Sequence, residues 1–235
     1  MQAVILAGGL ATRLRPITER VPKSLIPIYG RPFLEYQLDF LKAGGVQDVV
    51  LCIGYMGDQI KQNIGNGSNF GVSVRYSYDG EQLLGTGGAL KKAEGILDEK
   101  FFVIYGDSYL FIDFISVMSY FDKFKNPGLM TIYKNDNLYD RSNVVLENNM
   151  VKLYNKDKTI PGMVYIDYGA SLLRRGILDS VPREEFYSLE TIFNRLIKKK
   201  QLLAYEIRQR FFQIGSPEGL KEFEQYVFVK EKLVE

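Results

Sequence analysis

QAVILAGGLATRLRPITERVPKSL, residues 2–25, is the most informative stretch of the chain. The apolar run QAVILA is typical of a buried strand, and Gly8 and Gly9 follow it directly. Cations come next, at Arg13, Arg15, Arg20 and Lys23. Glycine lets backbone N–H groups approach an anion or a flat base closely, and the loop after the first strand of an open α/β sheet lies in the ligand-binding crevice. The stretch therefore predicts a phosphate-binding loop, although it fits neither the P-loop pattern nor the dinucleotide G-x-G-x-x-G pattern.

Composition excludes several classes of function. The chain has 235 residues, of which 46% are hydrophobic, so we expect a single domain over residues 1–235. The net charge is only +2 and no long basic block occurs, which argues against a nucleic-acid partner. Histidine is absent, which removes Ser-His and Cys-His catalysis, and a metal would have to be held by oxygen, as Mg²⁺ or Mn²⁺ are. Without a signal peptide or a long apolar run, we expect a cytoplasmic protein with no membrane partner.

The order of predicted elements indicates an α/β fold. Strand-like runs lie at residues 2–7, 48–54, 72–78, 100–107, 128–133 and 210–215. Helical patterns lie at 32–43, 56–65, 88–97, 114–124 and 189–200, and a last helix begins at Pro217 with Ser216 as its cap. Alternating strands and helices predict a parallel, doubly wound sheet flanked by helices. Residues 141–173 break the alternation and predict a mixed or antiparallel extension of that sheet.

The first loop resembles the pyrophosphorylase motif of sugar-1-phosphate nucleotidyltransferases. Further segments match that family in order: GTGGAL at 85–90, YGDS at 105–108, NK at 155–156, IDYG at 166–169 and QIGSPEGL at 213–220. The likeness covers nearly the whole catalytic domain and is strongest to the short members, such as heptose-1-phosphate guanylyltransferases and N-acetylmuramate-1-phosphate uridylyltransferases. It implies the Rossmann-like nucleotidyltransferase (GT-A-like) fold with a mixed sheet. It also implies a reaction in which an NTP and a sugar 1-phosphate give an NDP-sugar and pyrophosphate, by in-line attack on the α-phosphorus.

The resemblance also implies the site residues, in four groups. The catalytic group is Arg13, Lys23 and Asp107. The nucleotide-binding group is Leu6, Ala7, Gly8, Gly9, Gly85 and Thr86, with Glu81 or Gln82 reading the edge of the base. The sugar-phosphate group is Gly88, Lys156, Asp167 and Gly169. The metal ligand is Asp107, with Gln213 or Asp167 as candidates for a second ligand.

Two departures from the family pattern leave alternatives open. Ala11 replaces a glycine, which is a mild change provided that its φ is negative. Gln213 replaces an aspartate that acts as the second metal ligand, so an amide stands where a charge is usual. An active enzyme therefore competes with a non-catalytic, regulatory homologue that binds a nucleotide or NDP-sugar, and with a cytidylyltransferase acting on a phosphorylated non-sugar. The base and the sugar stay open, with a GDP-heptose-like, GDP-mannose-like or UDP-sugar product expected, and so does homo-oligomer formation.

Overall fold

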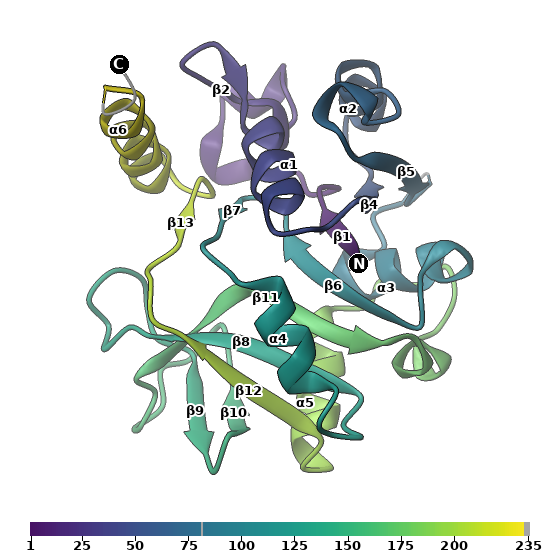
Figure 1. Cartoon of the computed structure of the whole chain (residues 1–235), viewed down its shortest axis with the longest axis vertical. Coiled ribbons are helices and arrows are strands. Elements are labelled where there is room, and N and C mark those ends of the chain that lie inside the picture. Colours follow the sequence, from purple (N-terminus) through teal and green to yellow (C-terminus); the bar gives the residue numbers. More distant parts are fainter. Residues whose placement is uncertain (81, 233–235) are drawn as a thin grey trace.

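A nine-stranded mixed sheet forms the centre of the protein (Figure 1). The computed structural model describes residues 1–80 and 82–232. The strands of this sheet are β1 (Gln2–Leu6), β4 (Asp48–Ile53), β5 (Ser73–Tyr78), β6 (Lys100–Tyr105), β8 (Gly128–Lys134), β9 (Val144–Glu147), β10 (Met150–Tyr154), β11 (Tyr165–Arg174) and β12 (Leu202–Ile207). Their order is β5-β4-β1-β6-β11-β8-β12-β10-β9.

The half of the sheet that contains β1 is parallel, as predicted. β1 pairs in parallel with β4 on one side and with β6 on the other, and β5 pairs in parallel with β4. The carboxyl ends of these strands therefore meet at one edge. Beyond β6 the sheet becomes mixed, because β11 runs antiparallel to both β6 and β8 and β9 runs antiparallel to β10. The extension predicted over residues 141–173 is confirmed.

Two features near the carboxyl terminus differ from the sequence prediction. Strand β12 was not expected, and it pairs in parallel with β8 along its whole length. The run 210–215 was predicted as a strand, and most of it is not extended. Only β13 (Phe212–Gln213) is extended, and it pairs with β7 (Ser108–Tyr109) outside the large sheet. The Phe212 ring stacks on Tyr226 of the last helix at a centroid distance of 4.7 Å.

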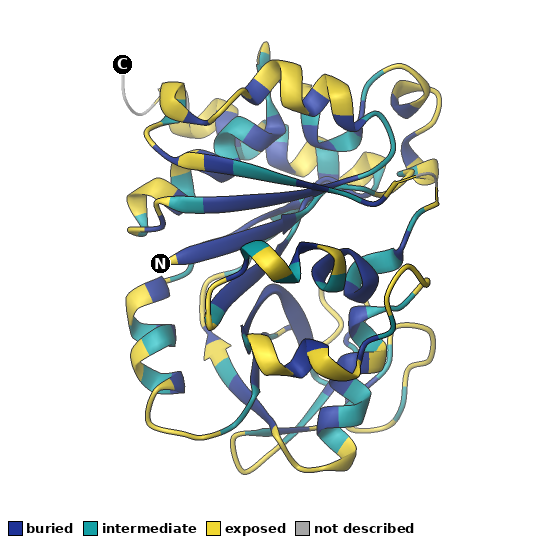
Figure 2. Cartoon of the chain, turned by 90° about the vertical axis from the view of Figure 1, so that its right-hand side faces the viewer, coloured by how far each residue is buried: buried dark blue, intermediate teal, exposed yellow. Residues whose placement is uncertain are grey.

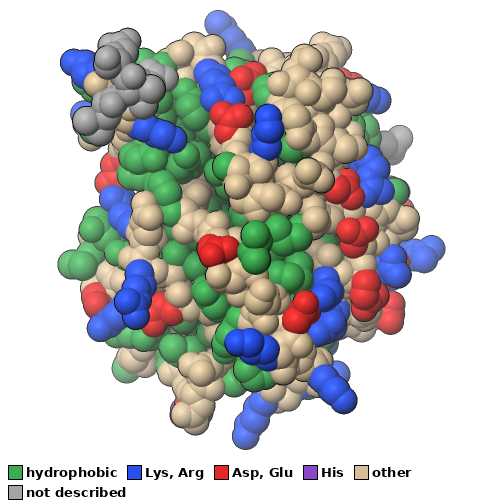
Figure 3. Space-filling model, viewed as in Figure 1, with side chains coloured by type: hydrophobic (Ala, Val, Ile, Leu, Met, Phe, Trp, Pro, Cys, Tyr) green, Lys and Arg blue, Asp and Glu red, His purple; other side chains and the backbone are tan. Residues whose placement is uncertain are grey.

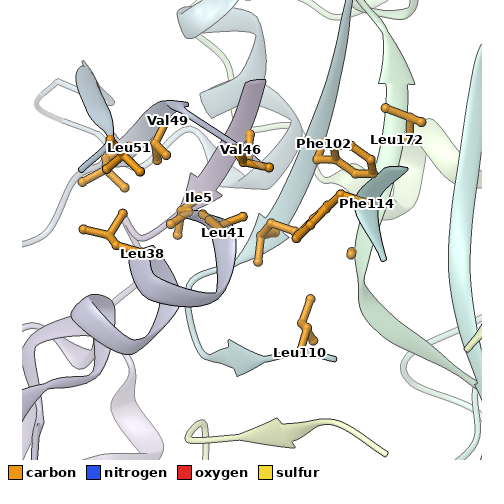
Figure 4. Packing of buried hydrophobic residues seen from close by; sticks show 14 of the residues in the cluster. Ile5, Leu38, Leu41, Val46, Val49, Leu51, Phe102, Leu110, Phe114 and Leu172 are labelled. Atoms are coloured by element: carbon orange, nitrogen blue, oxygen red, sulfur yellow. The ribbon is translucent and has the colours of Figure 1, made fainter. Parts of the chain in front are cut away.

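Helices cover both faces of the sheet (Figure 2). The helices are α1 (Phe33–Ala43), α2 (Gly57–Ile64), α3 (Gly85–Ala93), α4 (Phe114–Phe121), α5 (Leu189–Lys198) and α6 (Pro217–Lys232). Buried side chains of α1, α2 and α4 share one apolar cluster, whereas those of α3 and α5 share another. In the first cluster, Leu38 and Leu41 of α1 pack with Ile5, Val49 and Leu51 of the sheet (Figure 4). The helix predicted over 189–200 is α5, and its Leu189, Ile192, Phe193 and Leu196 are buried.

A third apolar cluster attaches α6 beside the end of β6. It joins Leu14 of the first loop, Phe33 of α1 and Tyr109 of β7 to Phe223 and Val227 of α6. Positive and negative side chains are interspersed over the face seen in Figure 3. In the described ranges, no helix combines the length and the apolar character needed to cross a membrane.

Candidate functional site

A cleft of about 460 Å³ opens at the carboxyl ends of the parallel strands. The structure brings many of the predicted site residues together on its walls: Leu6, Ala7, Gly8, Gly9, Lys23, Gly85, Thr86, Asp107 and Lys156. Six others are not part of its lining: Arg13, Gln82, Gly88, Asp167, Gly169 and Gln213. Glu81 lies outside the described residues. The carboxyl edge of an open α/β sheet is where ligands bind, so the cleft is the candidate active site.

The first loop brings bare backbone to the middle of the cleft. The N–H of Ala7 donates to the Cys52 carbonyl at 2.8 Å, which holds the end of β1 against β4. A Cβ on Gly8 would lie 3.1 Å from the backbone nitrogen of Gly54 and 3.4 Å from a carboxylate oxygen of Asp79. Glycine is needed at this position because two neighbouring segments come so close.

Ala11 adopts a left-handed backbone, with φ +48° and ψ +46°. The condition for a mild replacement, a negative φ, is therefore not met, and the replacement of glycine strains the backbone here. Hydrogen bonds to its carbonyl hold the loop in this shape, from the Thr18 hydroxyl at 2.9 Å and from the Leu14 N–H at 3.1 Å. A left-handed L-residue costs roughly 1–2 kcal/mol, which the chain accepts in the turn that leads to Arg13.

Lys23 and Asp107 form an ion pair on the wall of the cleft. The ammonium lies 2.7 Å from Oδ2 of Asp107, and both side chains are mostly buried. Asp107 follows β6 and is preceded by Gly106. A Cβ on Gly106 would lie 2.5 Å from the Leu6 carbonyl oxygen, so the close approach of β1 and β6 fixes the backbone just before Asp107. Burial alone would raise the pKa of Asp107, but the charge and hydrogen bond of Lys23, the charge of Lys156 and the Ser108 hydroxyl together outweigh burial and lower it. The carboxylate is therefore ionised at neutral pH.

Arg13 and Gln213 approach this ion pair at Gly215. A Cβ on Gly215 would lie 2.9 Å from Oδ2 of Asp107, 3.0 Å from Oε1 of Gln213 and 3.4 Å from Nη2 of Arg13. The side-chain oxygen Oε1 of Gln213 accepts the N–H of Gly215 at 2.5 Å, and its side-chain nitrogen Nε2 donates to the Ser216 hydroxyl at 3.3 Å. The amide thus ties down the turn before α6. Within the described residues, 1–80 and 82–232, there is no group of three or more Asp, Glu, Cys or His side chains that could hold a metal. A divalent cation bound to Asp107 would therefore take most of its oxygen ligands from substrate phosphates and water.

Asp167 lies behind the cleft wall, in a network of tyrosines. It is 9% exposed, and its Oδ2 accepts the hydroxyls of Tyr105 at 3.0 Å and Tyr154 at 2.9 Å. Its Oδ1 accepts the N–H of Gly169 at 3.1 Å. The Lys156 ammonium donates to the Tyr105 hydroxyl at 3.2 Å and lies 4.6 Å from that ring's centroid. Desolvation opposes the charge of Lys156, but the Tyr105 hydroxyl and Asp167 outweigh it and raise the Lys156 pKa.

The glycines of GTGGAL pack against the segment 185–188 rather than facing only the cleft. The N–H groups of Gly87 and Gly88 both donate to the Tyr187 carbonyl, at 2.8 and 3.0 Å. A Cβ on Gly88 would lie 2.7 Å from the Glu185 carbonyl, and one on Gly85 would lie 2.9 Å from the Phe186 ring. This segment brings Phe186 and Ser188 to the cleft, which the sequence analysis did not anticipate.

Asp79 is a further lining residue that was not predicted, and it is the one acidic residue among them. It follows β5 directly, at the same edge of the sheet as Asp107, so the rule that identified Asp107 could have found it. It is 7% exposed, and burial raises its pKa. A buried carboxylate in a cleft is a frequent sign of a functional group.

Known proteins share this sequence pattern and geometry. The sequence profile of the nucleotidyl transferase family matches residues 2–143. A D-glycero-α-D-manno-heptose 1-phosphate guanylyltransferase of Campylobacter jejuni is 30% identical over 224 residues, which cover 95% of this chain and 98% of that protein. A protein of the same name from Aneurinibacillus thermoaerophilus is 30% identical, with 97% of this chain and 100% of that protein covered. The crystal structure of HddC from Yersinia pseudotuberculosis, complexed with GMP-PN, matches with a TM-score of 0.81 and 26% identity over 96% of this chain and 99% of that chain.

Proposed function

The chain belongs to the nucleotidyl transferase family, and from that premise we propose that it transfers the nucleoside monophosphate of an NTP to a sugar 1-phosphate. The products are an NDP-sugar and pyrophosphate. The names of the two heptose-1-phosphate relatives favour a GDP-heptose or a similar GDP-sugar, with a UDP-sugar as the next product to test. The observation that carries the proposal is the Lys23–Asp107 ion pair, which lies on the cleft wall with the glycine loop of β1.

The proposed reaction needs positioning and charge neutralisation more than proton transfer. A phosphate oxygen of the sugar 1-phosphate attacks the α-phosphorus, and a new P–O bond forms there. The bond from the α-phosphorus to the oxygen bridging it to the β-phosphate breaks, and its electron pair leaves with pyrophosphate. The nucleophile is already an anion, so no general base is required, which agrees with a chain that contains no histidine.

The backbone of the first loop and four charged side chains, Arg13, Lys23, Asp107 and Lys156, each have a place in this scheme. The backbone from Leu6 to Gly9 binds the nucleotide, and Lys23 and Arg13 neutralise the triphosphate and the departing pyrophosphate. Lys156 holds the phosphate of the sugar, with its charge supported by the tyrosine network behind it. Asp107 holds a divalent cation, Mg²⁺ or else Mn²⁺, together with substrate oxygens. When bound, this cation neutralises negative charge that develops on the phosphates.

A screen of pyrophosphate release tests the proposal. GTP, UTP, CTP, dTTP and ATP are each combined with a panel of sugar 1-phosphates. We expect turnover with at least one pair, and we expect Asp107→Asn to lower it by at least about a hundredfold, as is usual when electrostatic stabilisation is lost. Asp98→Asn, which changes an exposed carboxylate away from the cleft, is the matched control. Near-normal turnover of Asp107→Asn would remove this residue from the mechanism.

One observation favours a second candidate, a homologue that binds nucleotides without catalysis. The amide of Gln213 stands close to Asp107 where the family pattern has a carboxylate, and it is already bonded to Gly215. If no NTP and sugar phosphate react while a nucleotide still binds, this second function holds. If Gln213→Asp then gains turnover, the missing carboxylate is the reason.

A further inference from the structure

The two ends of the cleft differ in chemistry. One end carries the charges of Lys23, Asp107 and Lys156. We take the other end to be the part around Asp79 and Leu83, which lie together because a Cβ on Gly54 would be 3.3 Å from Oδ2 of Asp79 and 2.8 Å from the Leu83 side chain. Cys52 and Ala89 add further apolar lining. If the triphosphate lies along the charged end, as the proposed function requires, the base of the nucleotide lies at the apolar end. Asp79 is then the charged side chain that faces it.

Asp79 keeps acceptor capacity for a ligand. Its Oδ2 accepts the Leu84 N–H at 3.2 Å, and within residues 1–80 and 82–232 this is the one hydrogen bond made to the carboxylate. No cation pairs with it directly in the same ranges. The positive charge of Lys92 lowers the pKa of Asp79 without direct contact. The Lys92 ammonium is instead paired with Glu184 at 2.5 Å. A carboxylate that is 7% exposed and has one donor lacks the partners that buried charges usually have.

We propose that Asp79 selects guanine, by accepting the N1–H and the 2-amino group of the base. This inference rests on the proposed function, since it takes the cleft to hold an NTP. Guanine is the common base with two adjacent donors on its Watson–Crick edge, and a carboxylate offers two adjacent acceptors. The pairing would also satisfy the lone pairs that Asp79 leaves unused in the free protein.

The other bases fit this carboxylate poorly. Uracil and thymine present one N–H between two carbonyl oxygens, and those oxygens would repel the charge of Asp79. Cytosine and adenine each present an amino group beside a ring nitrogen that is an acceptor, so one carboxylate oxygen would face a lone pair. Leaving a buried polar group unpaired is what allows a site to reject an analogue strongly.

Gln82 is the competing reader of the base. The family resemblance points to Glu81 or Gln82, but Gln82 is exposed and is not part of the cleft lining. The structure instead places Asp79 beside the backbone of Gly8 and Gly54, where a Cβ on either glycine would lie 3.4 or 3.3 Å from Oδ2 of Asp79. The base-reading group therefore lies close to the loop that leads to the phosphates.

Nucleotide binding by the full chain, measured by calorimetry without a sugar phosphate, tests the inference apart from turnover. The probes are GTP, UTP and ITP, because ITP keeps the N1–H of guanine but lacks its 2-amino group. We expect the parent to bind GTP roughly tenfold or more tightly than either UTP or ITP, as for loss of a hydrogen bond to a charged group. In Asp79→Asn, whose side-chain oxygen can still accept the Leu84 N–H, we expect the GTP-to-UTP ratio to fall at least about tenfold and the GTP-to-ITP ratio to approach one.

Two further variants sharpen the measurement. Asp113→Asn is the matched control, because Asp113 also accepts a backbone N–H before a helix, that of Ser116 at 3.0 Å, but outside the cleft. It should keep the preference of the parent. If Gln82→Ala loses the preference for GTP while Asp79→Asn keeps it, the assignment to Asp79 is overturned.

The outcomes separate this inference from the proposed function. A parent that binds UTP as well as GTP, or ITP as well as GTP, refutes the role of Asp79 whatever the variants do. Preferred turnover with UTP would refute the inference and leave nucleotidyl transfer intact. A GTP preference that depends on Asp79, found in a protein without turnover, would support the inference and refute catalysis.

Discussion

The left-handed backbone of Ala11 makes a prediction about stability that needs no knowledge of the substrate. At φ +48° and ψ +46°, an L-residue with a Cβ is strained, by roughly 1–2 kcal/mol relative to the right-handed region. Glycine removes that strain but gains freedom in the unfolded chain, which costs about 0.5–1 kcal/mol. The difference favours glycine by roughly 0.5–1 kcal/mol, so Ala11→Gly should stabilise the protein.

Urea unfolding and a thermal scan measure this effect. The predicted gain corresponds to a rise in Tm of roughly 1–4 °C for a chain of this size. Ala43→Gly is the matched control of opposite sign, because Ala43 is an exposed residue of α1, where glycine destabilises a helix by up to about 1 kcal/mol. If Ala11→Gly lowered stability as Ala43→Gly does, the left-handed conformation assigned to Ala11 would be wrong. That result would also remove the reason given for the shape of the first loop.

The proposed sugar-phosphate site and the proposed metal site can each be tested by one substitution. Tyr154→Phe removes a hydroxyl that lies 2.9 Å from Asp167, so the KM for the sugar 1-phosphate should rise about fivefold or more while the KM for the NTP stays unchanged. Tyr165→Phe is the control for this variant. Equal rises in the two KM values would contradict a positioning role for Tyr154. Gln213→Asp adds a carboxylate beside the ion pair of the cleft and should lower the Mg²⁺ concentration for half-maximal rate. With Gln209→Asp as control, an unchanged Mg²⁺ midpoint would place residue 213 outside the surroundings of the cation.

The fold was predictable where burial leaves a periodic pattern. The strands that became β1, β4 and β6 are short apolar runs bounded by glycine or charge, and their helices carry apolar stripes. The pattern does not reveal which strands pair at a distance. β12 is a short run after a helix, and the sequence around β13 looks like a strand because its phenylalanines are apolar. The Phe212 ring packs against the cluster under α6 instead, whereas Phe211 packs against the cluster that α1, α2 and α4 share, and only the tertiary structure shows this.

Within the site, motif residues were predictable but their neighbours were not. The roles given to Gly88 and Gly169 came from resemblance, and the structure shows that each packs closely against a distant segment. A Cβ on Gly169 would lie 2.9 Å from the Ser108 hydroxyl. The sign of φ at Ala11 was likewise hidden, because it depends on hydrogen bonds from Thr18 and Leu14 rather than on the residue itself. Asp79 was missed because it belongs to no motif, although its place after a strand was visible.

Asp79 and Asp107 show how one rule of topology yields two different functional groups. Each carboxylate comes just after a strand of the parallel half, β5 and β6, and so each reaches the same cleft on opposite sides of the β1 loop. Lys23 pairs with Asp107 at 2.7 Å and lowers its pKa, which suits a group that works among phosphates and a cation. Asp79 has no cationic partner within the described ranges, and burial raises its pKa. Such a carboxylate suits the proposed role of accepting hydrogen bonds from the neutral N–H groups of a base. Under the proposed function, these different surroundings give the two carboxylates different roles, Asp107 at the phosphates and Asp79 at the base, because the environment of a carboxyl group sets its chemistry.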